Sequence, residues 1–227
     1  MDKRSALIVG AGAGLSASLA RLFAKQGMRI ALAARDPGKL AALAGETAAA
    51  TYACDVSKAD DVAHLFAQLE SPPDVVVFNP SARARGPVAE LNPHDVERAI
   101  AISAFGGFLV GQAAARAMLP RGSGTIIFTG ASASVKGYPL SAPFAMGKFA
   151  LRGLAQSMAR ELAPKGIHIA HVVIDGGIHG PTHPEPADAP DSMLDPDAIA
   201  ESYLHLVNQR RSAWTWEIEV RPWVERF

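Results

Sequence analysis

Short apolar runs alternate along the chain with segments in which apolar residues recur every three or four positions. The runs lack the polar alternation of half-exposed strands, so they predict strands buried on both faces: residues 6–9, 28–33, 51–54, 74–78, 124–129 and 167–174. The segment from Leu15 to Gln26 carries its apolar residues at helical spacing, and Gly27 follows it as a stop. Strands and helices in this alternation predict βαβ units and therefore a parallel sheet.

The second half of the chain continues the pattern with longer helices. Residues 93–119 and 142–163 each predict a long helix, and residues 197–208 predict a shorter one. Residues 214–220 alternate like a last strand, whereas the proline-rich residues 176–196 predict an ordered loop, which we call the lid loop. With 227 residues and no internal repeat, residues 1–227 are expected to form a single domain.

Composition narrows the possible functions. Lys plus Arg and Asp plus Glu both number 22, so the net charge is zero and favours neither nucleic-acid nor membrane-surface binding. Cys54 is the single cysteine, which rules out an intrachain disulfide and suits a reducing compartment. The N-terminal residues lack the layout of a signal peptide, and no apolar run reaches the about 18 residues of a membrane span. We therefore expect a cytoplasmic protein, and we expect His179 and His183 in the lid loop to face solvent or substrate and not a metal.

A glycine-rich turn joins the first predicted strand to the first predicted helix. Gly10, Gly12 and Gly14 allow a tight turn and a close approach of the backbone to a pyrophosphate. The N-terminus of the following helix offers free N–H groups and the positive end of its dipole. The turn therefore predicts a dinucleotide site, the alternative being a tight turn without a ligand.

The end of the second predicted strand indicates which dinucleotide would bind. An acidic residue there would bind the ribose 2′-hydroxyl of NAD, but this chain has Ala34 followed by Arg35. Arginine suits a 2′-phosphate, which favours NADP(H) over NAD(H); the alternative is a solvated arginine at a helix start. Asp55, after the third strand, is placed to meet the adenine edge or simply to cap the next turn.

Several motifs together resemble those of the short-chain dehydrogenase/reductase family, over nearly the whole chain. They are the glycine turn from Val9 to Ser16, the pair Asp55-Val56, the strand from Asp74 to Ser81 with Asn79, the tract from Gly124 to Gly137, the stretch Phe144 to Lys148, and Ile174-Asp175-Gly176. Ser16 replaces the last glycine of the family's turn, and Asp175 stands where the family usually has proline.

The resemblance implies an α/β Rossmann-type doubly wound fold, with seven parallel strands in the order 3-2-1-4-5-6-7. It also implies that the two long helices pair with a second copy, giving a homodimer or homotetramer that acts on a small-molecule substrate. The residues expected to bind the cofactor are Gly10, Gly12, Gly14, Leu15, Arg35, Asp55, Val56, Asn79, Lys148, Gly176 and Ile178.

The catalytic positions of the family are only partly kept. In the family, a tyrosine exchanges the hydroxyl proton, a lysine four residues later supports it, a serine orients the substrate oxygen, and an asparagine completes the relay. Lys148 matches the lysine, but the tyrosine position holds Phe144 and the asparagine position Ser103. The serine position falls on Ala131, beside Ser132 and Ser134.

Loss of a positioned general acid typically costs about 10²–10⁴-fold in rate. Candidates for a substitute are Tyr138, Ser132, Ser134 and a water held by Lys148. We therefore expect an NADP(H)-dependent oxidoreductase for a small carbonyl, alcohol or activated double bond, with a non-standard proton relay. The alternative is a catalytically inactive NADP(H)-binding sensor or partner subunit.

Overall fold

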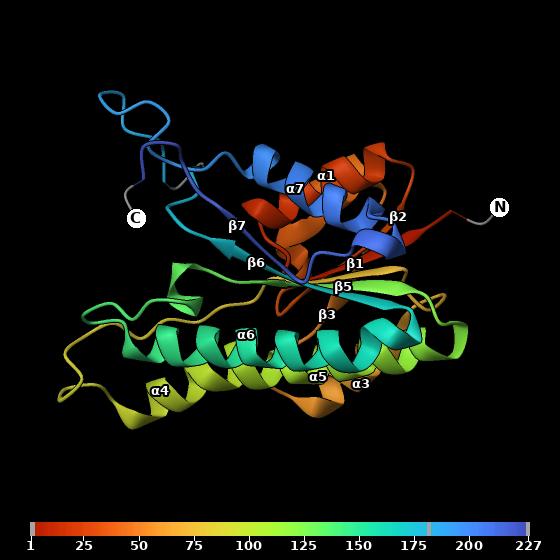
Figure 1. The fold of residues 1–227 in the computed structure, drawn as a ribbon, viewed down its shortest axis with the longest axis horizontal. Helices are drawn as coiled ribbons and strands as arrows, with labels where there is room; N and C mark the ends of the chain where they lie inside the picture. The colour runs from red at the N-terminus through yellow and green to blue at the C-terminus, as the bar shows by residue number, and fades with distance from the viewer. Residues whose placement is uncertain (1–2, 181–182, 226–227) are drawn as a thin grey trace.

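A computed structural model of the chain describes residues 3–180 and 183–225. Seven parallel strands form one sheet in the order β3-β2-β1-β4-β5-β6-β7 (Figure 1). The strands are β1 Ser5–Val9, β2 Arg29–Ala34, β3 Ala50–Ala53, β4 Val75–Phe78, β5 Gly124–Thr129, β6 Ile167–Ile174 and β7 Glu217–Val220. The fold class and the strand order expected from the sequence are both confirmed.

The central strands are buried on both faces, as their unbroken apolar composition predicts. All four residues of β4 and all eight of β6 are buried, whereas every residue of the edge strand β7 keeps part of its surface exposed. In register, Leu7 of β1 lies between Ala31 and Val76 on its two neighbours. Because the strands are parallel, their carboxyl ends lie at one edge of the sheet. The loops after β4, β5 and β6 gather at this edge, at the left of Figure 1.

Helices cover both faces of the sheet, and each face has its own apolar core (Figure 1). One layer contains α1 Leu15–Lys25, α2 Ala41–Thr47 and α7 Pro196–Asn208. The other contains α3 Ala59–Gln68, α4 Pro93–Ile100, α5 Gly106–Met118 and α6 Ala142–Leu162. Short helical turns complete the described part of the chain: η1 Pro37–Leu40, η2 Ala101–Phe105, η3 Leu119–Arg121, η4 Ser132–Ser134, η5 Ala163–Lys165 and η6 Arg211–Ala213.

The long helix expected over residues 93–119 is not uniform. Its middle, η2, is a π-helical segment between α4 and α5. This segment lies so close to α6 that a Cβ atom on Gly147 would be 2.8 Å from the Cβ of Ser103. π-Helical segments inside α-helices are frequently found at functional sites. Here Ser103 is fully buried and its hydroxyl accepts a hydrogen bond from the Ala82 N–H at 3.3 Å.

The stretch Pro93–Arg121 is also long and apolar enough, by length and composition, to cross a membrane. Its apolar residues Val110, Ala114 and Met118 are buried in the core beneath the sheet. Packing against the sheet therefore accounts for part of the apolar composition, whereas Phe105, Phe108 and Leu119 stay exposed by 37–48%.

The last strand is shorter than the sequence pattern indicates. The alternation over residues 214–220 yields strand only in β7, from Glu217. Trp214 instead stacks on the His168 ring, with the ring centroids 4.9 Å apart, and donates a hydrogen bond to the Gln209 carbonyl. This packing holds Trp214 outside the strand ladder.

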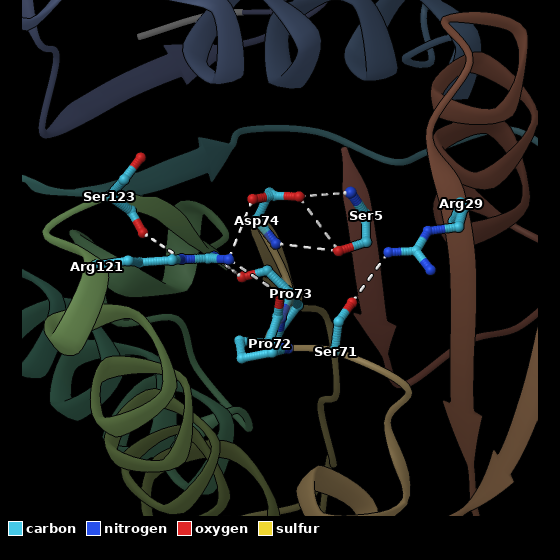
Figure 2. A network of polar contacts seen from close by, with 8 residues as sticks. All are labelled: Ser5, Arg29, Ser71, Pro72, Pro73, Asp74, Arg121 and Ser123. Atoms are coloured by element: carbon cyan, nitrogen blue, oxygen red, sulfur yellow. Dashed lines mark hydrogen bonds and ion pairs between the residues drawn. The ribbon is translucent and has the colours of Figure 1, made fainter. Parts of the chain in front are cut away.

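A polar network fastens the amino-terminal edge of the sheet, opposite the gathered loops (Figure 2). Arg121 forms an ion pair with Asp74 at 3.3 Å and donates hydrogen bonds to the carbonyls of Pro72, Pro73 and Ser123. The other Asp74 carboxylate oxygen accepts a hydrogen bond from the Ser5 N–H at 2.8 Å. This network therefore joins the starts of β1, β4 and β5. The carboxyl ends of the strands lie at the opposite edge and remain free for a site.

The lid loop is anchored at its base, although residues 181 and 182 lie outside the described part of the chain. Ile178 and Leu194 form an isolated parallel bridge, and the Leu194 N–H donates to the Gly177 carbonyl at 2.7 Å. The Glu185 carboxylate accepts a hydrogen bond from the Met193 N–H at 3.1 Å. The loop predicted over residues 176–196 thus starts and ends at the same edge of the sheet as the glycine turn.

Candidate functional site

The glycine turn has the geometry of an anion cradle. Gly10 has φ +79, and a Cβ atom there would lie 2.7 Å from Pro80, so only glycine fits. At Gly12 and Gly14 a Cβ atom would meet open space, so the room beside these two residues is unfilled. No side chain caps the start of α1, and its first turn contains no acidic residue. The N–H groups of this helix end are therefore available to an anionic ligand.

Asn79 supports the turn from the next strand. Its side-chain N–H donates to the Ser16 hydroxyl at 2.7 Å, and that hydroxyl donates to the Gly10 carbonyl at 3.1 Å. The Asn79 backbone N–H also donates to the Val9 carbonyl at 3.0 Å. In this chain Asn79 thus fixes the shape of the turn through Ser16. The sequence indicates Ser16 only as a replacement for a glycine of the family's turn. Serine hydroxyls often form hydrogen bonds to nearby backbone carbonyls, and this tendency could have indicated its role.

Arg35 and Asp55 lie near each other at the ends of β2 and β3. Arg35 is exposed directly after β2. Asp55 accepts hydrogen bonds from the Ser57 hydroxyl and N–H, at 2.7 and 3.1 Å. These bonds chiefly lower the pKa of Asp55, and the charges of Lys58 and Arg35 contribute less. Asp55 therefore caps the turn before α3, which is the alternative that the sequence left open, and adenine contact stays a prediction.

The remaining predicted cofactor residues surround this edge. The side chains of Leu15 and Val56 are buried in the cores beneath the two helix layers. Gly176 has φ +149, and a Cβ atom on it would lie 2.9 Å from Pro222, so the chain needs glycine where it leaves β6. Ile178, half-buried, lies at the base of the lid loop.

Lys148 lies on α6 and is buried. Its ammonium donates a hydrogen bond to the Thr129 carbonyl at 2.7 Å. The Thr129 hydroxyl shares a hydrogen bond of 2.9 Å with the buried Tyr203 hydroxyl, which fixes the end of β5. Burial, and secondly the charge of Arg83, lowers the pKa of Lys148 to about 7. This lysine can therefore gain or lose a proton near neutral pH.

Phe144 is buried, one helical turn before Lys148. The Arg83 guanidinium carbon lies 4.2 Å from the centroid of its ring, and the Lys148 ammonium nitrogen lies 5.9 Å from that centroid. Two cationic side chains thus flank the ring that occupies the tyrosine position. Sequence reasoning missed Arg83, because nothing in the local pattern indicates that the loop after β4 folds onto α6.

The hydroxyl candidates are unequal. The buried Ser134 hydroxyl accepts a hydrogen bond from the Ala131 N–H at 3.1 Å, and the Ser103 hydroxyl accepts one from Ala82. Ser132 starts η4 and is half-buried, and no hydrogen bond of its hydroxyl is seen among residues 3–180 and 183–225. Tyr138 is 44% exposed in the following loop. Of these four, Ser132 combines partial shelter with an uncommitted hydroxyl.

Behind Lys148, β6 and β7 bring together a buried histidine and a carboxylate. His171 Nδ1 lies 3.0 Å from a Glu217 carboxylate oxygen, and Arg152 donates two hydrogen bonds to the same carboxylate, at 2.6 and 2.7 Å. His171 Nε2 is buried and has no hydrogen-bond partner within the described ranges. Burial lowers the pKa of His171 to about 4, against the opposing effect of Glu217. The ring is therefore neutral at neutral pH.

Asp175, in the position where the related motif has proline, also has a structural role. Its buried carboxylate lies 3.2 Å from the Lys136 ammonium and 3.3 Å from the Arg221 guanidinium. These ion pairs tie β6 to the loop after β5 and to the chain after β7. They position the base of the lid loop.

A hollow of about 430 Å³ lies at the opposite edge of the sheet, lined in part by Met28, Tyr52 and Leu69. Its lining also includes polar residues such as Lys3, Arg29 and Glu70, but it lies at the amino ends of the strands. Because ligands of open parallel sheets bind outside the carboxyl ends of the strands, we assign the site to the edge with the glycine turn and Lys148.

Comparison with known proteins gives consistent matches. A family model described as short chain dehydrogenase matches residues 4–183. A human 3-oxoacyl-[acyl-carrier-protein] reductase is 29% identical over 184 residues, covering 79% of this chain and 77% of the relative. A crystal structure of a short-chain dehydrogenase from Rhodopseudomonas palustris is 34% identical with a TM-score of 0.85, covering 98% of this chain and all of that one. A metagenomic short-chain oxidoreductase solved with NADP is 28% identical with a TM-score of 0.84, covering 96% of this chain and 97% of that one.

Proposed function

The chain belongs to the short-chain dehydrogenase/reductase family of oxidoreductases, and from this premise we propose that it is NADP(H)-dependent and acts on a small carbonyl, alcohol or activated double bond. The observation that carries the proposal is the pairing of an uncapped, open glycine turn with a buried Lys148 at the same edge of the sheet. A nucleotide cofactor and a substrate would meet between them.

The residues present fit a nicotinamide dinucleotide. The open space at Gly12 and Gly14, with the free N–H groups of α1, suits a pyrophosphate. Arg35 is exposed and suits a 2′-phosphate, which favours NADP(H); the metagenomic relative was solved with NADP. Lys148 would bind the nicotinamide ribose, and Asp55, Asn79, Gly176 and Ile178 would complete the site. When bound, this cofactor supplies or accepts the hydride.

Proton transfer in this chain requires a group other than Phe144. The Lys148 ammonium has a pKa of about 7 and lies beside the ring, so it can hold or release a proton, directly or through water. Ser132 offers the uncommitted hydroxyl that would orient a substrate oxygen. Ser103 and Tyr138 contribute less, because Ser103 is bonded to Ala82 and Tyr138 lies in an exposed loop.

The test begins with NADPH and NADH titration, followed by a panel of carbonyl substrates. We expect NADPH binding and slow turnover in the wild type. In Phe144→Tyr, the added hydroxyl beside Lys148 should raise kcat by about 10²-fold or more while leaving NADPH affinity nearly unchanged. Absence of NADPH binding at millimolar cofactor would overturn the proposal. Cofactor binding without any wild-type turnover would instead favour the sensor or partner-subunit role.

We also propose that the chain forms a homo-oligomer through α5 and α6. Large apolar side chains on these helices and on η2 are exposed by 41–51%: Phe105, Phe108, Met146 and Phe149. The Phe105 and Phe108 rings stack with centroids 6.1 Å apart. An apolar surface of this kind is typical of a subunit contact. Light scattering of the wild type and of Phe149→Glu would show whether the pairing depends on it.

A further inference from the structure

We propose that Arg83 forms an anion subsite in the candidate active site, and that the physiological substrate is therefore a carbonyl compound or alcohol that carries a carboxylate. This inference deepens the proposed function and depends on the same site. It begins from the position of the Arg83 guanidinium, whose central carbon lies 4.2 Å from the centroid of the Phe144 ring.

Arg83 is exposed, and no hydrogen bond of its guanidinium is seen among residues 3–180 and 183–225, so its N–H donors are free. A guanidinium over a ring face is held by cation–π attraction, and its N–H donors point outward in the plane of the group. Those donors match the two oxygens of a carboxylate, which accepts two parallel hydrogen bonds from them. The Phe144 ring thus supports the arginine and does not consume its donors.

The loop that carries Arg83 is fastened on both sides of this residue. Before it, the Ala82 N–H donates to the buried Ser103 hydroxyl at 3.3 Å. After it, the Gly86 N–H donates to the Leu140 carbonyl at 3.1 Å. Arg83 is therefore presented from a short anchored span between α6 and the loop after β5. The anchoring lowers the conformational entropy that ligand binding would otherwise cost.

The charge around Arg83 lacks an internal counterion. Arg83 and Lys148 lie on the same Phe144 ring, and across residues 3–180 and 183–225 no carboxylate comes within 4.0 Å of either cation. By contrast, Arg152 is paired with Glu217, and Arg121 with Asp74. The exposed and uncompensated charge of Arg83, next to the buried Lys148, attracts an anionic ligand and raises its local concentration.

The cofactor phosphates have other partners, which leaves Arg83 for the substrate. The pyrophosphate belongs at the start of α1 and the 2′-phosphate at Arg35, at the ends of β1 and β2. Arg83 follows β4 and contacts α6, on the side of the candidate site that holds Phe144 and Lys148. An acid group bound there would place the reacting carbon of a short substrate near Lys148.

The experiment compares 4-formylbenzoate with its methyl ester, which share the same aldehyde and differ in one negative charge. With NADPH, the wild type should reduce the acid with kcat/KM about 10-fold or more above that of the ester. Arg83→Gln should lose about 10–100-fold in kcat/KM for the acid, mainly through KM, and little for the ester. Arg83→Lys should restore part of the preference. Arg116→Gln, which removes an exposed charge on α5, should behave like the wild type.

A second readout does not require turnover. Calorimetry of benzoate and benzamide binding, with and without NADPH, should show tighter benzoate binding in the wild type and Arg116→Gln and none of that preference in Arg83→Gln. Equal benzoate affinity in wild type and Arg83→Gln overturns the subsite, whether or not the enzyme reduces any aldehyde. Charge-selective benzoate binding that depends on Arg83, in a protein that does not bind NADPH, would keep the subsite and reject the proposed function.

Discussion

Replacing Lys148 by methionine should stabilise the apoprotein, because this lysine is buried without a carboxylate partner. Its pKa falls from the ordinary 10.5 to about 7, and each pKa unit corresponds to about 1.4 kcal/mol. The charged ammonium therefore costs roughly 4–5 kcal/mol at neutral pH relative to the unfolded chain. The hydrogen bond to the Thr129 carbonyl, worth about 1.5–3 kcal/mol, offsets part of that cost.

The net gain for Lys148→Met is therefore about 2 kcal/mol at neutral pH, or a rise in Tm of about 4–8 °C for a chain of this length. The gain depends on pH in a defined direction. Between about pH 7 and pH 10.5 the unfolded chain binds the Lys148 proton more tightly than the folded protein, so wild-type stability increases with pH across this window. Methionine lacks this contribution, and the difference between the two proteins should shrink as the pH rises.

Thermal and urea unfolding, followed by circular dichroism between about pH 6 and pH 9.5, would measure this difference without cofactor, because a ligand would stabilise only the protein that binds it. Lys25→Met, at an exposed lysine on α1, is the matched control and should change little. With NADPH present the order should reverse, since Lys148 is the proposed ribose ligand. A less stable Lys148→Met apoprotein at neutral pH, or a difference that stays constant with pH, would refute the reasoning.

Two further predictions concern the cofactor and the buried histidine. Arg35→Ser should weaken NADPH binding by about 10–100-fold in calorimetry and leave NADH binding nearly unchanged, because only the 2′-phosphate is lost as a partner; an equal loss for both cofactors would contradict the assignment. The pKa of His171 falls to about 4, so between pH 6.5 and 4 its ring is neutral in the folded protein but charged in the unfolded chain. The free energy of unfolding should therefore drop by roughly 3 kcal/mol as the pH falls from 6.5 to 4. His171→Gln should flatten that part of a urea-unfolding pH profile, and an unaltered slope would show that other groups are responsible.

The sheet could be read from the sequence because its strands are buried on both faces. The runs in β1, β4 and β6 are nearly all apolar, and helical spacing marks the segments between them. Boundaries moved by a residue or two, and the largest change came at the edge, where Trp214 packs on His168 and not in the ladder. An edge position is decided by packing against neighbours and not by the local pattern.

The residues of the candidate site also fall into two groups, those that the sequence predicts and those that only tertiary contacts position. The glycine turn, Arg35 and Lys148 are visible in the sequence, because each depends on local backbone geometry or on a fixed spacing along one helix. The π-helical segment that buries Ser103 could not be predicted, since it depends on the close approach of α6 at Gly147. The same holds for the Asn79–Ser16–Gly10 chain, which joins residues from different strands and turns.

The sequence by itself therefore determined the βαβ architecture, the dinucleotide turn and the absence of a hydroxyl at Phe144, because periodicity and residue chemistry act over short distances along the chain. Only the tertiary structure decided what replaces that hydroxyl. It placed Arg83 on the Phe144 ring, 61 positions away in the sequence, and it withdrew Lys148 from water. Charge, burial and stacking at that point depend on which surfaces meet, and the fold alone sets this.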